Sequence, residues 1–330
     1  MSELRRDPIL RRWVIIAPQR LVELPRPPWP SAFDDGEPCP FCPGNEHLNP
    51  VEIAAERNGD GWAVRVTPDR APLLRIEGDL GRRGSGMFDL MNPVGAHELV
   101  ADTPSHTRGW ADFTPAEMSR LLGTYRARAL DLRRDARFRH VLVLKNHGAA
   151  WSRFRHAHSH VVAMPFTPKR LEEELGGARA YFRMRERCVF CDQLAEECEA
   201  QERLVAQNDA FVTYSPFAAE QPYELRIVPR QHAADFGSLS DDARPQLAEL
   251  LVDALARLRT VLGDPPYSVA LHAGPVDGAD GSEFHWHWEI VPRLGLELGM
   301  EWATGIYSNP VAPETAAAAL RAARPGSRAL

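Results

Sequence analysis

Hydrophobic and polar positions alternate in two stretches of the chain, one near the middle and one near the end. Residues 155–165 read RHAHSHVVAMP, and residues 284–293 read FHWHWEIVPR. Because neighbouring side chains of a β-strand point to opposite faces, each stretch predicts a strand with its histidines on one face. Three imidazoles on one face, at His156, His158 and His160, are costly to desolvate unless they bind something. The alternative is a polar strand face at a sheet edge.

The rest of the pattern predicts further strands and three helices. The strands expected from short β-rich runs cover residues 13–17, 64–67, 98–103, 141–145, 211–214, 223–228 and 267–271. Thr114 and Glu117 stand at capping-box spacing around a proline, which predicts a helix to about residue 134. The other helices are expected at about 168–185 and 240–262. The glycine-rich residues 78–95 are expected to form a flexible loop.

The order of these elements repeats with a period near 130 residues. In each half a Glu-Leu pair precedes a histidine, His106 or His232, by eight positions, and a capped helix begins eight residues after it. The alternating strand that opens with His156 in the first half opens with His285 in the second. Repetition of a whole domain-sized unit indicates an internal duplication rather than a solenoid.

The duplication predicts an α+β protein of two tandem domains with one fold. We expect each domain to be an antiparallel sheet with packed helices. The boundary falls after the helix that ends near residue 185, which gives an N-terminal domain of residues 1–185 and a C-terminal domain of residues 186–330.

The composition is that of an ordinary globular protein, and it argues against nucleic acid and membranes as partners. The 330 residues are 44% hydrophobic and 25% charged, with a net charge of −6, which argues against a nucleic-acid partner. The first ten residues lack the apolar core of a secretory signal, and no apolar run is long enough to span a bilayer. We therefore expect a cytoplasmic protein that does not bind membranes.

Four of the five cysteines form two C-x-x-C pairs, a spacing that in a reducing compartment suggests metal ligands. Each half adds a histidine at a strand end and one at the start of the alternating strand, which completes a Cys₂His₂ zinc set. His97 competes with His106 for the first set, but His232 has no such neighbour, so the repeat favours His106. The two sets are Cys39, Cys42, His106 and His156, and Cys188, Cys191, His232 and His285.

Four protein ligands make each set a closed, structural site, so we expect two zinc ions per chain. The alternative is that the cysteines are small buried hydrophobic residues. The fifth cysteine, Cys198, is expected to be structural. If zinc holds His156, the imidazole of His158 is fixed two residues away and becomes a candidate nucleophile toward phosphorus. Since tryptophans and Glu289 surround His287 in the second half, that strand is interpreted as structural.

These motifs together resemble the galactose-1-phosphate uridylyltransferase family of the histidine-triad superfamily, including its ADP-glucose phosphorylase-like branch with two zinc sites. The segments that carry the resemblance run in order over almost the whole chain and read DPILRRWVIIAPQR, CPFC, HELVADTPSH, LKNHGAA, HAHSHVVAMP, CVFC, VPRQH, LHAGP, HWHWEIVPR and GIYSNPVAPE. The resemblance implies two histidine-triad-like domains and ping-pong transfer of a nucleoside monophosphate between a nucleotide sugar and a hexose 1-phosphate. It places the covalent intermediate on His158 and implies a homodimer.

His160 stands where the family usually has a glutamine that contacts the phosphate of the nucleotidylated intermediate. A histidine at this position is typical of the hydrolytic branch of the superfamily. We interpret His160 as a catalytic residue that passes a proton to a leaving group or takes one from water. The alternative is that it donates one neutral hydrogen bond, as glutamine would.

The segment before the zinc histidine is bulkier than the family's phosphate loop and reads Ala150-Trp151-Ser152-Arg153-Phe154-Arg155. Arginine can replace a loop contact with a charged, bidentate one. Asp69 stands where the family often has an asparagine near the nucleoside. The residues that the resemblance implies for phosphate or substrate binding are Asn146, Ser152, Arg153, Arg155, Asp69 and Arg20.

Three functions follow from the sequence. The first is a nucleotidyltransferase acting on UDP- or ADP-hexose and a hexose 1-phosphate. The second is a phosphorylase or hydrolase acting on a nucleotide sugar or a dinucleoside polyphosphate. The third is a nucleotide-binding or zinc-stabilised interaction protein without turnover.

Overall fold

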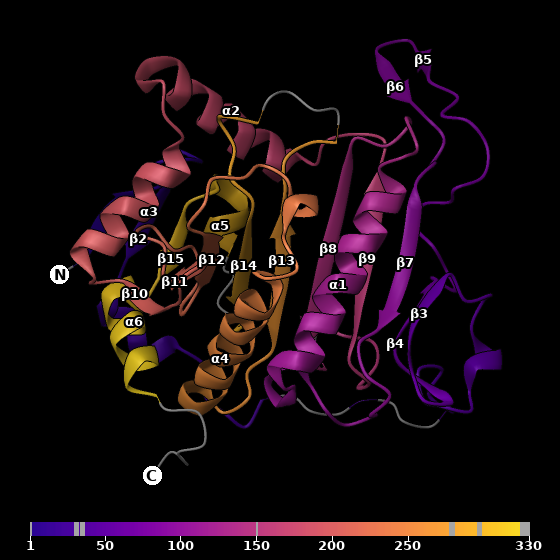
Figure 1. Ribbon diagram of the computed structural model, residues 1–330. Helices are drawn as coiled ribbons and strands as arrows, with labels where there is room; N and C mark the ends of the chain where they lie inside the picture. The colour runs from indigo at the N-terminus through magenta and orange to yellow at the C-terminus, as the bar shows by residue number, and fades with distance from the viewer. Residues whose placement is uncertain are drawn as a thin grey trace.

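A ten-stranded antiparallel sheet runs through the centre of the protein (Figure 1). The computed structural model describes residues 2–29, 33, 37–149, 151–276, 281–295 and 299–323. The strand order is β10-β11-β12-β14-β13-β8-β9-β7-β4-β3. From one edge to the other, the strands are β10 (Leu204–Gln207), β11 (Phe211–Tyr214), β12 (Leu225–Pro229), β14 (His287–Pro292), β13 (Tyr267–His272), β8 (His140–His147), β9 (His158–Met164), β7 (Ala96–Ala101), β4 (Gly61–Pro68) and β3 (Ala54–Asn58).

Each half of the chain contributes five strands, and their order is the same when it is counted from the edge inwards. The halves join where β8 pairs with β13, with Leu144 opposite Ala270 and His147 opposite Tyr267. The predicted α+β class with antiparallel sheets is confirmed, although the strands of both halves form one continuous sheet. The division into domains at residue 185 stays a prediction.

Two long helices, α1 (Pro115–Leu132) and α4 (Arg244–Leu262), cover one face of this sheet (Figure 1). The predicted capping box begins α1: the Thr114 hydroxyl accepts from the Glu117 amide at 3.2 Å. Residues of both helices and both halves of the sheet form one hydrophobic core, in which Tyr125 lies 6.3 Å from Trp288. Since Ser159 also contacts Tyr125, the histidines that alternate with it point to the opposite face of the sheet.

That opposite face is covered in the second half by α2 (Lys169–Arg185), which carries ion pairs to β13 and β14. The helix α3 (Val189–Ala200) follows it. A smaller sheet joins the two ends of the chain, because β2 (Trp13–Ile16) pairs with β1 (Glu3–Arg6) and, in parallel, with β15 (Tyr307–Asn309). The remaining helical elements are η1 (Pro18–Glu23), η2 (Glu46–Leu48), η3 (Trp110–Asp112), η4 (Phe236–Ser238), α5 (Gly299–Thr304) and α6 (Pro313–Ala322).

The expected loop at residues 78–95 contains a small hairpin, in which β5 (Arg83–Ser85) pairs with β6 (Phe88–Leu90). This ribbon projects from the body of the molecule (Figure 1). The helices α3 and α6 and the edge strands β3 and β10 were not expected from the sequence. Within the described residues, no helix is both long and apolar enough to cross a membrane.

Adjacent glycines in α2 provide a test of how closely the N-terminal segment packs on it. A Cβ atom on Gly177 would lie 1.8 Å from the carbonyl oxygen of Ile9, whereas one on Gly176 would meet nothing within 4 Å. We predict that Gly177→Ala lowers the free energy of unfolding by about 1–3 kcal/mol through overpacking. Gly176→Ala, the matched control, should raise it by about 0.5–1 kcal/mol through helix propensity. Urea denaturation measures both, and equal effects of the two substitutions would contradict the close contact.

Candidate active site

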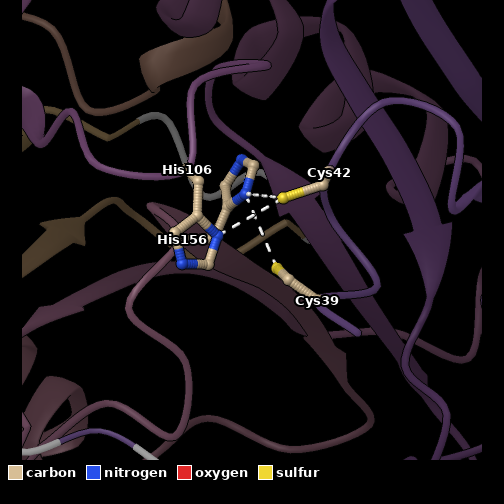
Figure 2. A group of neighbouring side chains, drawn as sticks. All are labelled: Cys39, Cys42, His106 and His156. Atoms are coloured by element: carbon tan, nitrogen blue, oxygen red, sulfur yellow. Dashed lines mark hydrogen bonds between the residues drawn. The ribbon is translucent and has the colours of Figure 1, made fainter. Parts of the chain in front are cut away.

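The first predicted metal set comes together at one end of the central strands (Figure 2). His106 Nδ1 lies 3.3 Å from Cys42 Sγ, and His156 Nδ1 lies 3.6 Å from the sulfurs of both Cys39 and Cys42. The structure thus brings His106 to the cysteines, as the sequence predicts, while His97 lies elsewhere, beside His160.

This donor set fits zinc. With Zn–S and Zn–N distances of about 2.3 and 2.1 Å, tetrahedral coordination places sulfur and nitrogen about 3.6 Å apart. The sulfur–nitrogen distances here are 3.3 and 3.6 Å. The Nε2–H of His156 donates to the Thr103 carbonyl at 2.7 Å, which leaves the lone pair on Nδ1 facing the sulfurs. Such a second hydrogen bond is usual for a histidine that ligates a metal.

The second predicted set has the same arrangement. Cys191 Sγ lies 3.3 Å from His232 Nδ1 and 3.4 Å from His285 Nδ1, and Cys188 completes the group. His232 Nε2 donates to the Gly281 carbonyl, so its Nδ1 also carries the lone pair. Both predicted Cys₂His₂ groups therefore have the geometry of metal-binding sites.

His158 begins β9, two residues after the metal-facing His156. Its Nδ1 lies 2.9 Å from the His156 carbonyl and donates to it, so the lone pair of the neutral ring is on Nε2. Burial, with the charge of Lys145, lowers the pKa of His158 to about 3, so the ring is uncharged at neutral pH. A fixed, neutral imidazole with one bare nitrogen is what nucleophilic attack on phosphorus requires.

Two phenylalanines that sequence reasoning missed hold this ring in place. Phe41 stacks on His158, with centroids 5.0 Å apart and planes at 16°, and Phe154 meets it edge-on at 5.7 Å. The second half repeats the first contact, because Phe190 lies 5.2 Å from His287. Both Phe41 and Phe190 occupy the third position of a C-x-F-C knuckle, so the repeated phenylalanine was the available signal. The knuckle that contributes the two cysteines therefore also packs against the central histidine of the strand.

A buried ion pair lies behind His158. Lys145 Nζ donates to Asp102 Oδ2 at 3.0 Å and to the carbonyl of His158 at 2.7 Å. Asp102 also accepts from Trp110 Nε1 at 2.8 Å and from Ser159 Oγ at 2.6 Å, so its carboxylate is well satisfied. These contacts fix the backbone of β9 at the site, and the sequence offered no pattern that marked Lys145 for this role.

His158 lines a cavity of about 470 Å³. The structure brings most of the predicted substrate residues to it: Asp69, Asn146, Ser152, Arg153 and His160. Ala150, at the start of the predicted phosphate loop, lies outside the described residues. Arg70 and Trp151 also line the cavity and were not predicted.

Two predicted phosphate contacts lie away from this cavity. Arg155 lines two neighbouring cavities and lies over the ring of Phe33, 5.6 Å from its centroid. Arg20 lies in η1, where its guanidinium donates to the hydroxyl of Ser308 on β15 at 3.2 Å. The reason is topological: η1 follows β2, which pairs with the C-terminal strand rather than with the central sheet.

The corresponding face of the second half is closed. His287 is fully buried and stacks on His272 at 4.9 Å. His272 donates from both ring nitrogens, to Glu174 of α2 at 3.0 Å and to Glu289 at 3.2 Å. Burial alone would lower the pKa of His272, but the two carboxylates raise it to about 10. An imidazolium that donates twice has no lone pair for a metal, so we interpret this cluster as structural, as predicted for this strand.

Comparison with known proteins agrees with these features. Residues 174–295 match the model of the galactose-1-phosphate uridyl transferase C-terminal domain. The ADP-glucose phosphorylase of Arabidopsis thaliana is 30% identical over 97% of this chain and 92% of its own length. The chain belongs to the galactose-1-phosphate uridylyltransferase family. It is therefore an enzyme of nucleotidyl transfer within the histidine-triad superfamily.

Other relatives and solved structures support the same family. The galactose-1-phosphate uridylyltransferase of Thermotoga maritima is 27% identical over 97% of this chain and 98% of its own length. The crystal structure of the Arabidopsis ADP-glucose phosphorylase with bound ADP-glucose superimposes with a TM-score of 0.86 at 30% identity, covering 98% of this chain and 99% of that one. A uridylyltransferase structure superimposes with a TM-score of 0.78 at 25% identity, over 98% of both chains.

The two lysines of the chain provide a test of the ion pair behind His158. We predict that Lys145→Met lowers the free energy of unfolding by about 3–5 kcal/mol, because it leaves the Asp102 carboxylate buried without its cation. The Lys169 side chain is 78% exposed. Lys169→Met should therefore change stability by less than about 0.5 kcal/mol. Urea denaturation of both variants measures the difference, and equal midpoints would contradict a stabilising role for the ion pair.

Proposed function

We propose that this enzyme moves a nucleoside monophosphate from a nucleotide sugar to a hexose 1-phosphate through a covalent intermediate on His158. The observation that carries the proposal is the orientation of this ring in a cavity large enough for a nucleotide. Its Nδ1–H donates to the His156 carbonyl, so the lone pair on Nε2 is available to attack phosphorus. The likeness to uridylyltransferases and to an ADP-glucose phosphorylase supports nucleotide sugars as donors.

The chemistry runs in two balanced displacements. His158 Nε2 attacks the phosphorus that carries the nucleoside, an N–P bond forms, and the P–O bond to the sugar phosphate breaks. A phosphate oxygen of the incoming hexose 1-phosphate then attacks the same phosphorus and releases His158. We assign phosphate contacts to Asn146, Ser152 and Arg153, which line the cavity with His158.

Asp69 and His160 complete the proposed site. Both line the same cavity, and Asp69 is assigned to the nucleoside. We assign His160 to the phosphate of the intermediate. Its role in proton transfer stays a prediction. The phosphate roles of Arg20 and Arg155 also stay predictions, which the positions of these side chains outside the cavity do not support.

A phosphorylase is the second candidate function. The observation that favours it is that the 30% identical relative is an ADP-glucose phosphorylase and aligns over nearly the whole chain. The first displacement is then unchanged, and inorganic phosphate replaces hexose 1-phosphate as the attacking group. The two functions differ only in the acceptor, so one experiment separates them.

We also propose two zinc ions per chain, one in each Cys₂His₂ group. The donor set and its spacing support zinc, and four protein ligands leave no open position for catalysis. When bound, each ion ties a knuckle to two histidines from distant parts of the sequence. Since reduced cysteines are needed as ligands, the proposal is consistent with a protein of the cytoplasm.

A homodimer is the assembly we propose. Large apolar side chains are exposed on and beside the β5–β6 ribbon, which projects from the molecule (Figure 1). Met87 is 89% exposed and Phe88 is 66% exposed. An apolar patch of this kind is typical of a surface that another chain covers.

Labelled nucleotide sugar tests the covalent step. Protein incubated with UDP- or ADP-glucose labelled in the phosphate next to the nucleoside should retain label, and His158→Gly should retain none because it lacks the nucleophile. Release of the label by hexose 1-phosphate indicates a transferase, release by inorganic phosphate a phosphorylase, and release by water a hydrolase. Label that persists on the glycine variant would exclude His158 as the nucleophile.

Metal analysis tests the zinc sites. Protein purified without chelator should contain two zinc ions per chain, and His106→Asn should lower both the zinc content and the melting temperature. His97→Asn, the matched control, should keep both ions, since His97 lies outside the Cys₂His₂ group. One ion or none in the unmodified protein would contradict the proposal for one or both sites.

A further inference from the structure

A buried histidine and a half-buried one, on neighbouring strands, contact one another at the edge of the cavity. His97 is on β7 and His160 on β9, and His97 Nε2 lies 3.0 Å from His160 Nδ1. Asp69 Oδ2 lies 3.4 Å from the same nitrogen of His97. A hydrogen bond between two neutral imidazoles needs one proton between the nitrogens, so its direction depends on which ring supplies it.

The backbone decides this direction. The amide of Leu73 donates to His97 Nδ1 at 3.3 Å, so that nitrogen bears the lone pair. A neutral His97 then carries its proton on Nε2, where it faces both His160 and Asp69. Burial lowers the pKa of His97, which keeps the ring neutral. Since His97 supplies the proton, His160 Nδ1 is the acceptor, and His160 carries its own proton on Nε2.

The same three side chains could be read as a metal site, since their ligand atoms cluster at metal-binding distances. The Leu73 amide argues against this reading. An ion bound to His97 Nε2 needs the lone pair there and the proton on Nδ1, but Nδ1 is already an acceptor from the backbone. In the two Cys₂His₂ groups the situation is opposite, because the nitrogens away from the sulfurs of His156 and His232 donate to carbonyls.

We propose that His97 is a positioning residue that fixes His160 as the Nε2–H tautomer. The neutral ring of His160 then donates from Nε2 to a phosphate oxygen of the intermediate on His158. This inference rests on the proposed function for the identity of the ligand, but the tautomer itself does not.

One consequence concerns water. To act as a general base, His160 would need a bare nitrogen facing the site, and the proton donated by His97 places that bare nitrogen on the far side of the ring. The pKa of His160 is lowered to about 4 by burial and by His97, so the ring is not a ready acid in the free protein either. The arrangement favours the neutral-donor interpretation of His160 over proton transfer.

Substitutions of similar size at His97 test whether its hydrogen bond sets the tautomer of His160. His97→Gln keeps an N–H that can donate to His160, whereas His97→Glu has the same length and offers only acceptors. His97→Leu removes the donor without adding charge. Nitrogen-15 NMR of histidine-labelled protein reads the tautomer directly, and the spectrum of His160→Gln assigns the His160 signals by their loss.

We expect His160 to be protonated on Nε2 in the unmodified protein and in His97→Gln, and on Nδ1 in His97→Glu. Nucleotidyl transfer, measured as kcat/KM, should fall about tenfold to hundredfold in His97→Glu, less in His97→Leu, and least in His97→Gln, in line with one charge-assisted hydrogen bond. If kcat/KM falls only in the variants whose His160 tautomer changes, His97 acts by positioning His160 and not only by stabilising the fold.

A His160 protonated on Nδ1 in the unmodified protein would overturn the proposal, as would equal losses in His97→Gln and His97→Glu with an unchanged tautomer. Reading the His160 tautomer in the unmodified protein needs no substitution at His97, so a His97 variant that fails to fold leaves this part of the test intact. The NMR measurement also needs no substrate, and its outcome is therefore independent of whether His158 forms an adduct.

Discussion

The buried ion pair between Lys145 and Asp102 is the interaction on which the active site depends. It joins β8, the end of β7 and the start of β9, and Lys145 also donates to the carbonyl of the proposed nucleophile, His158. Charges this deeply buried are tolerated only when their hydrogen bonds are satisfied, and Trp110 and Ser159 supply donors to the carboxylate. The backbone of β9 is thereby fixed before any substrate arrives.

The two halves of the sheet share one arrangement around the central histidine, but only one half leaves that histidine accessible. Both place a histidine beside a knuckle phenylalanine, and both hold its Nδ1 on the carbonyl two residues earlier. In the second half α2 covers this face, and Glu174 and Glu289 surround His272, so His287 is sealed. In the first half the equivalent face opens into a cavity that His158 lines. One chain therefore presents one histidine suited to act as a nucleophile and two Cys₂His₂ groups with metal-binding geometry.

Patterns that depend on spacing predicted the fold and much of the site. Alternation located β9 and β14, and the repeated C-x-x-C and histidine spacings identified both Cys₂His₂ groups. Contacts between residues that are far apart in sequence were not predictable in this way. Lys145 looks like an ordinary strand residue, and His97 looks only like a competing metal ligand, until pairing places them beside Asp102 and His160. Arg20 was expected near phosphate, but the pairing of β2 with β15 places it elsewhere.

The central claim is that only the open half of the sheet carries a nucleophile. Peptide mass spectrometry of protein quenched after incubation with nucleotide sugar tests it most directly, because it locates the attached nucleoside monophosphate. The account predicts the modification on the peptide that contains His158 and on no other, with His287 unmodified. A modification on His287 or on His160, or turnover without any modified histidine, would contradict it.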